Sequence, residues 1–192
     1  MERETVVSDS TFYIAFLKKE EINDPQALIL FLKSYRFSMG QVIRKEIREK
    51  HAELLEELGL ENLVEIEENY NYAALLSPIG DRVFQKGEYE SMAIAFIKLY
   101  EGALHSLVID DNRARKWLEK NLPQLSDYLK YSTRFIANSC IVDGKVSKDE
   151  VLRILQKIKQ SIERGARPFN LTRKQLGKVE QLIREVEKFG KD

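Results

Sequence analysis

The chain has 192 residues, enough for one domain with a substantial hydrophobic core. Its 31 basic and 31 acidic residues give a net charge near zero, which argues against a strongly basic protein that wraps nucleic acid. The single cysteine, Cys140, excludes an internal disulfide, and no apolar run is long enough to span a bilayer. Because the first residues also lack the layout of a signal peptide, we expect a cytoplasmic protein with no membrane attachment.

The first expected elements are a short strand and two helices. Residues 5–7 are rich in β-branched side chains and are followed by Asp9, and residues 12–19 have the pattern of a helix. Asp24 and Pro25 then provide the N-cap and the first-turn proline of a second helix, whose apolar face extends to Tyr35. The apolar helices over residues 12–17 and 28–35 offer a face for a homodimer.

A long charged helix is expected next. Residues 37–40 break the pattern, and helical spacing resumes over residues 41–58 until Gly59, which is well placed to end the helix. Glu46 lies on this helix, where composition alone favours a solvated surface residue. After a short strand over residues 63–66, residues 67–81 are expected to connect elements, with a short helix at 72–76.

The strongest functional signal is a pair of acids after an apolar run. Residues 107–109 predict a buried strand, Asp110 and Asp111 follow directly, and a helix is expected from Arg113. Two adjacent carboxylates at a strand end favour a bound cation, at the edge of the sheet where α/β proteins bind ligands. The simpler explanation is that Asp111 or Asn112 caps the following helix.

Two further acids, Glu88 and Glu90, occupy the first turn of a buried helix predicted to follow Lys86. An acid in this position also suits the helix dipole, without any catalytic role. Strands and helices alternate along the chain as far as this point. This order predicts an α/β fold with a mainly parallel central sheet.

The C-terminal part is expected to be mostly helical. Residues 125–140 predict a short strand or a helix, and residues 142–145 a turn. Ser147 and Glu150 have the spacing of a capping box and begin the next helix, and Asn170 or Thr172 caps the last one.

The chemistry available to the chain is that of carboxylates. No nucleophile with a matching base, zinc-ligand spacing or glycine-rich phosphate loop is present, and His51 and His105 share no motif. Acids without histidine or thiol ligands suit Mg²⁺ or Mn²⁺, which activate water and neutralise phosphate oxygens. Asp9 and the acids after residue 109 both follow strands, so we expect them to face one cleft.

Three motifs, in order, resemble those of the PIN-domain family: SDST after the first strand, KGEYESMAIA before the buried helix, and LVIDDNRAR around the acid pair. The similarity is to the VapC-like branch, in which a Gly-Glu-x-Glu-Ala-Ile motif precedes an Asp-Asp motif. The segment GKVSKDEVLRILQKIK is similar to the C-terminal helical segment of that branch. The resemblance implies a three-layer α/β/α sandwich, with a PIN-like nuclease domain over residues 1–130 and a C-terminal helical segment over residues 131–192 packed on it.

The resemblance also implies a function and a site. It implies an endoribonuclease that depends on Mg²⁺ or Mn²⁺, acts on RNA and is the toxin of a toxin–antitoxin pair, with a small antitoxin protein as partner. The residues it assigns are Asp9, Glu46, Glu88 and Asp111 as catalytic, Asp9, Glu88, Asp110 and Asp111 as metal ligands, and Ser10, Glu90 and Asn112 as supporting.

Two other functions stay open at this point. The first is a non-catalytic binding module with the PIN fold, assembled into a larger complex. The second is a metal-dependent phosphatase, which a strand-end acid also permits. A phosphatase would need a basic or glycine-rich loop to hold phosphate, and the sequence has none.

Overall fold

The computed structural model describes residues 5–68 and 86–190. Its centre is a sheet of five parallel strands in the order β3-β2-β1-β4-β5. The strands are β1 (Thr5–Ser8), β2 (Arg36–Gly40), β3 (Val64–Glu67), β4 (Leu104–Val108) and β5 (Leu129–Lys130). The chain builds outward from β1 to β3 and then returns to the other side of β1. The strand order therefore switches between β1 and β4, and their carboxyl ends border the crevice where such sheets bind ligands.

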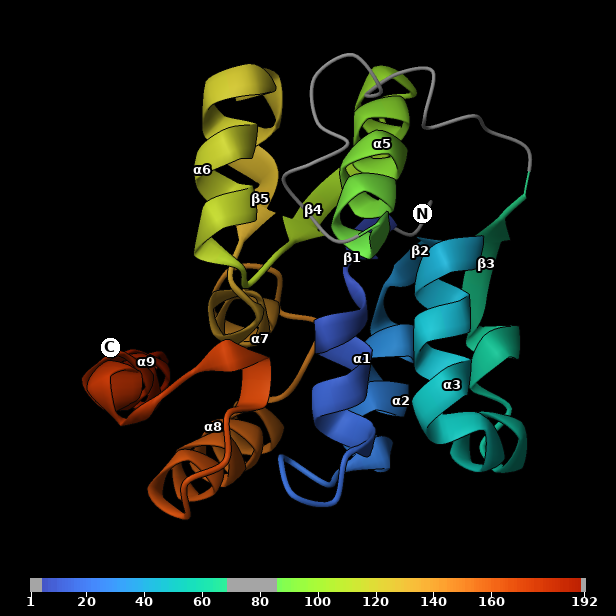
Figure 1. Ribbon diagram of the computed structural model, residues 1–192. Coiled ribbons are helices and arrows are strands. Elements are labelled where there is room, and N and C mark those ends of the chain that lie inside the picture. The colour runs from blue at the N-terminus through green and yellow to red at the C-terminus, as the bar shows by residue number, and fades with distance from the viewer. Residues whose placement is uncertain (1–4, 69–85, 191–192) are drawn as a thin grey trace.

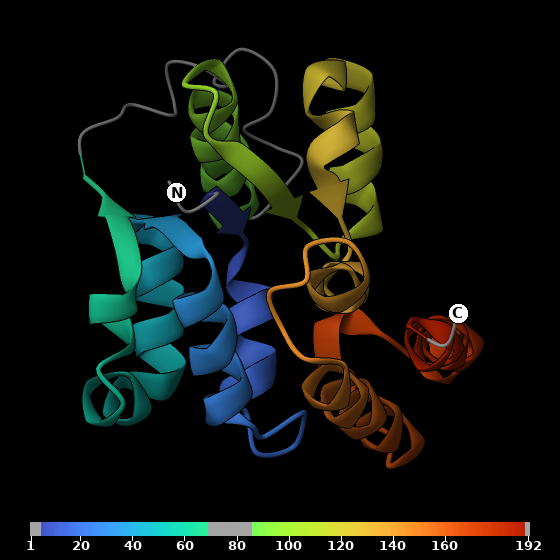
Figure 2. The same ribbon diagram turned by 180° about the vertical axis from the view of Figure 1, so that it is seen from behind.

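Helices cover both faces of the sheet, as Figures 1 and 2 show. On one face lie α5 (Lys86–Tyr100) and α6 (Asn112–Asn121). On the other lie α1 (Ser10–Leu17), α2 (Pro25–Ser34), α3 (Gln41–Glu57), α7 (Ser132–Ile141), α8 (Lys148–Glu163) and α9 (Leu176–Lys188). The predicted three-layer α/β/α sandwich with C-terminal helices is confirmed. Short 3-10 turns complete the fold: η1 (Leu60–Leu63), η2 (Pro123–Tyr128), η3 (Pro168–Asn170) and η4 (Arg173–Gln175).

Successive side chains of a strand point to opposite faces of the sheet, so the protein has two hydrophobic cores, one on each face. Val6 of β1 packs into the larger core, beneath α1–α3 and α7–α9, whereas Val7 packs into the smaller core beneath α5 and α6. The larger core contains an aromatic cluster to which Phe12, Phe31 and Phe135 contribute from three helices. The apolar faces of α1 and α2 are thus buried inside one chain and are not available for the expected dimer face.

An ion-pair cluster joins the C-terminal helices to the start of the chain. Asp24 caps α2, and its carboxylate also accepts hydrogen bonds from Arg153 and from Lys157, the latter at 2.7 Å. Because Asp24 is buried and both cations come from α8, this contact fixes α8 against α2.

The structure corrects one element of the sequence-based prediction. Residues 37–40, which were expected only to interrupt the helical pattern, belong to strand β2, which pairs with β1 on one side and with β3 on the other. Ser38 and Gly40 are weak strand formers, so the local sequence contains little β signal. Pairing on both sides holds the segment extended, and this pairing is visible only in the folded chain.

Other boundaries differ less. The strand predicted at residues 107–109 begins at Leu104, and residues 125–140 contain both a short strand, β5, and a helix, α7. The short helix predicted at residues 72–76 lies outside the described residues. Within residues 5–68 and 86–190, no helix is long and apolar enough to cross a membrane.

Candidate functional site

The predicted acids meet at the carboxyl ends of the two central strands. Ser8, the last residue of β1, pairs with Val108, the last residue of β4. Asp9 therefore follows one strand end, and Asp110 lies two residues beyond the neighbouring end. Both carboxylates are almost completely buried, with Asp9 4% exposed and Asp110 7% exposed.

Asp9 is both a helix cap and a member of an acidic cluster. Its side chain accepts a hydrogen bond of 3.0 Å from the backbone N–H of Thr11 and caps α1. Burial raises the pKa of Asp9 well above its usual range, and the negative charges of Asp110 and Glu88 raise it further. Three of the predicted metal ligands thus act on one another electrostatically.

Asp110 is held by the first residue of α7. Its carboxylate accepts hydrogen bonds from the backbone N–H of Ser132 at 2.9 Å and from the Ser132 hydroxyl. Burial raises the pKa of Asp110 to about 6, while the bonds from Ser132 and the charge of Arg115 oppose the rise. No sequence motif indicated Ser132, because its contact with Asp110 joins residues 22 positions apart in the chain.

Asp111 caps α6, as the simpler explanation of the acid pair predicted. Its Oδ1 accepts hydrogen bonds from the backbone N–H groups of Arg113 and Ala114, at 2.8 and 2.7 Å. The side chain is half-buried and lines a cleft that also contains Glu46 and Glu88. Capping does not remove Asp111 from the site, because a carboxylate has further lone pairs on both oxygens.

Glu46 reaches the site from α3. The hydroxyl of Ser10 donates a hydrogen bond of 2.6 Å to its Oε2. The first turn of α5 approaches the same carboxylate closely, because a Cβ atom on Gly87 would lie 2.9 Å from that oxygen. Glu46 is half-buried and lines a cleft together with Glu88 and Asp111, so solvent still reaches its carboxylate.

Glu90 supports the site rather than lining it. Its buried carboxylate accepts hydrogen bonds from the backbone N–H groups of Val42 and Ile43, at 3.0 and 2.8 Å, and so caps α3 from another helix. Burial raises the pKa of Glu90, and these backbone bonds oppose the rise. The contact fixes α5 against α3, the two helices that carry Glu88 and Glu46.

The cleft lined by Glu46, Glu88 and Asp111, which we call the acidic cleft, has a volume of about 480 Å³. Besides its acidic side chains, the cleft is lined by three basic side chains, those of Lys18, Lys50 and Arg167. Such a lining suits an anionic substrate. The acidic side chains would hold a metal ion that binds the substrate, and the basic side chains would attract the substrate directly. Arg167 and Asn170 come from the C-terminal segment, and no sequence motif assigned either of them to the site.

The donors fit a hard divalent cation by their chemistry. They offer only oxygen atoms, and the mutual repulsion that raises the pKa of Asp9 would be relieved by a bound positive charge. In the described part of the chain, however, no three His, Cys, Asp or Glu side chains form a ready-made ligand set. The carboxylates of Asp9 and Asp110 are instead hydrogen-bonded to Thr11 and Ser132.

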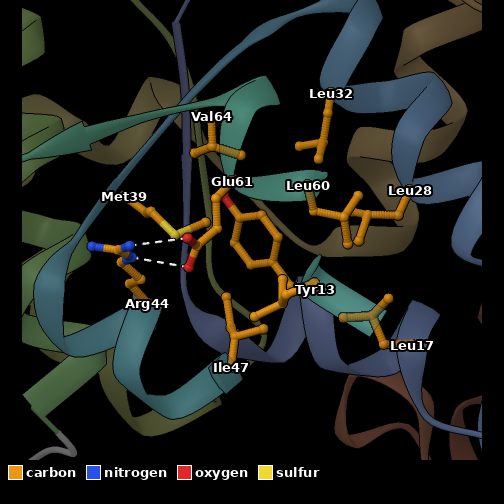
Figure 3. Close-up of a pocket in the computed structure, with 11 residues that line it drawn as sticks. Tyr13, Leu17, Leu28, Leu32, Met39, Arg44, Ile47, Leu60, Glu61 and Val64 are labelled. Atoms are coloured by element: carbon orange, nitrogen blue, oxygen red, sulfur yellow. Dashed lines mark hydrogen bonds and ion pairs between the residues drawn. The ribbon is translucent and has the colours of Figure 1, made fainter. Parts of the chain in front are cut away.

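A separate small cavity lies in the core around Tyr13, between α1, α2, α3 and β3 (Figure 3). Apolar side chains surround the ring, and an ion pair between Arg44 and Glu61 lies at its edge. Its volume of about 10 Å³ leaves room for one water molecule at most. This cavity is therefore a feature of core packing and not a ligand site.

A serine, a histidine and an aspartate also form a hydrogen-bonded series elsewhere in the fold. The Ser106 hydroxyl lies 2.8 Å from Nδ1 of His105, and Nε2 of His105 lies 3.3 Å from Oδ1 of Asp143. Ser106 is completely buried, so no substrate reaches its hydroxyl. The network joins β4 to the turn after α7 and has a structural role.

Comparisons of the chain with protein-family models, with curated proteins and with solved structures give no match.

Proposed function

We propose that the chain is a PIN-like endoribonuclease that depends on Mg²⁺ or Mn²⁺. The observation that carries the proposal is the burial of Asp9 and Asp110 side by side at the carboxyl ends of β1 and β4, where the charges of Asp110 and Glu88 help raise the pKa of Asp9. Clustered, perturbed carboxylates are characteristic of functional sites, and these lie where the strand order switches.

The roles of the side chains follow from their positions. Asp9, Glu88 and Asp110 would hold the cation, with Asp111 at the margin of the cleft. When bound, a divalent cation lowers the pKa of water and neutralises charge on a phosphodiester. Ser10 holds one oxygen of Glu46, which leaves the other oxygen to orient a water molecule and accept its proton.

The basic side chains of the cleft would bind the RNA backbone. Lys18, Lys50 and Arg167 line the same cleft as Glu88 and Asp111, so their positive charges would attract an RNA phosphate bound there. A toxin of this kind has a small antitoxin protein that covers the cleft, and we propose such a partner for this chain. A homodimer is also proposed, through a surface other than the apolar faces of α1 and α2.

A non-catalytic binding module is the second candidate, and one observation favours it. Asp9, Asp110 and Asp111 each accept hydrogen bonds from backbone N–H groups at the start of a helix. These bonds stabilise the fold without any metal ion, so the acids have a structural function even in a protein that cleaves nothing.

Cleavage of a mixed RNA pool separates the two candidates. The purified chain is incubated with Mn²⁺, with Mg²⁺ or with a chelator, beside two variants, Asp9→Asn and the control Asp127→Asn. Asp127 is an exposed acid in η2 and does not line the cleft. Metal-dependent cleavage that is lost only in Asp9→Asn supports the ribonuclease, whereas equal cleavage by both variants contradicts it. Absence of both cleavage and metal binding favours the binding module.

A further inference from the structure

A second cavity opens beside the acidic cleft. It has a volume of about 180 Å³, and both spaces are lined by Asp111 and Asn170. Tyr131 and apolar side chains of the C-terminal segment such as Leu171 also line the second cavity. Pockets for drug-sized ligands are larger, at about 300–1,000 Å³, so this cavity suits one ring system rather than a whole nucleotide.

The ring of Tyr131 is held in place although 38% of the residue is exposed. The Arg115 guanidinium covers it at 3.7 Å from the ring centre, and the Tyr131 hydroxyl donates a hydrogen bond of 2.8 Å to Oδ1 of Asn112. Arg115 is itself buried and donates to the carbonyl oxygen of Ile109 at 2.9 Å. An exposed aromatic ring fixed in this way loses little conformational entropy when a ligand stacks on it.

Asn170 is placed between the two spaces by an unusual backbone. Phe169 and Asn170 both have positive φ angles, of 55° and 59°. Asparagine tolerates this conformation, but a bulky phenylalanine rarely adopts it. Phe169 is kept there because its ring is buried against Phe12 and Phe16. The aromatic core thus holds the exposed Asn170 at the junction of the cleft and the cavity.

A second amide on the wall has a defined orientation. The Oε1 of Gln175 accepts hydrogen bonds from the backbone N–H and the hydroxyl of Thr172. The Nε2 group of Gln175 is therefore left to donate. With the amide of Asn170, the cavity offers donors and an acceptor around a flat aromatic surface, a combination that matches the edge and the face of a nucleobase.

We infer that the second cavity binds one base of the RNA strand, next to the phosphodiester that lies over the acids. The inference rests on the proposed ribonuclease function and adds a base-binding subsite to it. Tyr131 provides the stacking surface, and Asn170 and Gln175 bind the base edge. The position of Asp111 in both spaces places this base directly beside the site of cleavage.

The test is a binding measurement that does not depend on cleavage. Fluorescein-labelled single-stranded homopolymers of A, C, G and U are titrated with the full chain, in chelator and again with Ca²⁺, a hard cation that oxygen ligands also bind, and anisotropy is recorded. Tyr131→Ala should weaken binding of the tightest homopolymer between about 5-fold and about 100-fold, the usual effect of losing one stacked base. Tyr131→Phe keeps the ring and should bind within about twofold of the parent chain.

Two further variants complete the test. Asn170→Gly removes the amide without backbone strain, because glycine adopts positive φ freely, and it should reduce the differences among the four homopolymers. Tyr100→Ala removes an exposed tyrosine at the far end of α5 and should have no effect. Circular dichroism of each variant confirms that it is folded.

Each result decides the inference. Loss of affinity in Tyr131→Ala supports the base site, even if the parent chain proves not to cleave RNA and the proposed ribonuclease fails. Unchanged affinity in both Tyr131→Ala and Asn170→Gly overturns the base site, and metal-dependent cleavage by the parent chain then still supports the ribonuclease. If the parent chain binds none of the homopolymers, the base site is also overturned. The cavity would then suit a side chain of a protein partner.

Discussion

The carboxylate of Glu90 occupies the space that a side chain on Gly40 would need. A Cβ atom at Gly40 would lie 2.1 Å from Cδ of Glu90, well inside van der Waals contact. The φ angle of Gly40 is −96°, which any residue adopts, so close approach and not backbone conformation requires glycine here. This contact brings the start of α3 and the start of α5 together at the site.

Replacing Gly40 should therefore destabilise the protein. Gly40→Ala displaces Glu90 from the N–H groups of Val42 and Ile43, and we expect a loss of about 2–4 kcal/mol in the free energy of unfolding. Gly177→Ala is the matched control, because a Cβ there meets no atom within 4 Å and alanine favours the α9 helix by about 0.5–1 kcal/mol. Urea denaturation measures both. Equal stability of the two variants would show that Glu90 moves aside at little cost.

The pKa of Asp110 predicts a pH dependence of stability without metal. The folded state raises this pKa from 3.8 to about 6, so the folded protein favours the protonated form. The contribution of Asp110 to the free energy of unfolding is therefore most favourable below about pH 4. It falls by about 3 kcal/mol as the pH rises through about 6. Asp110→Asn should thus match the parent chain near pH 4 and exceed its stability near pH 7. Unfolding curves across this range, in chelator, give the difference, and a difference that does not change with pH would refute the prediction.

Metal binding should be visible as stabilisation. Mn²⁺ at about 100 times its dissociation constant stabilises a folded protein by about 2.7 kcal/mol, or about 5–10 °C in Tm for a chain of this size. We expect this shift for the parent chain and for Asp127→Asn, but not for Asp9→Asn. Without metal, Asp9→Asn should be as stable as the parent chain or more stable, because it removes a repelled buried charge. Scanning fluorimetry with and without Mn²⁺ provides the readout, and a full shift in Asp9→Asn would exclude Asp9 as a ligand.

The Asp24 ion pairs should make the protein less stable as the pH falls, whereas Asp110 makes it less stable as the pH rises. Burial alone would raise the pKa of Asp24, but the hydrogen bonds from Lys157 and Arg153 outweigh it and hold the pKa below its usual range. This stability is present at neutral pH and is lost as the pH falls through the lowered pKa. Asp24→Ala should cost about 2–3 kcal/mol at pH 7, with Asp149→Asn, an exposed acid on α8, as control. If the loss persists unchanged at acid pH, the ion pairs are not its cause.

A chain ending at residue 130 should not fold by itself. Phe135 of α7 and Ile154 of α8 are completely buried in the same core as Phe12 and Phe31. Truncation exposes that core, and we expect an insoluble or unfolded fragment by circular dichroism. Co-expression with residues 131–192 should restore a soluble complex. A cooperative unfolding transition of the fragment alone would show that the first 130 residues are an independent domain.

Much of the site could be placed along the chain from local patterns. An acid directly after a β-rich run, as at Asp9 and Asp110, predicts a position at the strand ends, and parallel strands bring such positions to one edge. The capping roles of Asp111 and Asp24 also follow from short-range rules. By contrast, β2 was not predicted, because Ser38 and Gly40 are extended only through their neighbours.

By itself, the sequence determined the alternating strands and helices, the layered fold and the acids at strand ends. These depend on side-chain periodicity and on hydrogen bonds between residues close in the chain. Only the tertiary structure decided which acids lie close enough to raise one another's pKa. It also decided that Glu90 caps α3 and that Tyr131 and Asn170 line a cavity beside Asp111. Each of these contacts joins residues far apart in sequence. Their geometry depends on how the helices pack on the sheet, which local propensity does not encode.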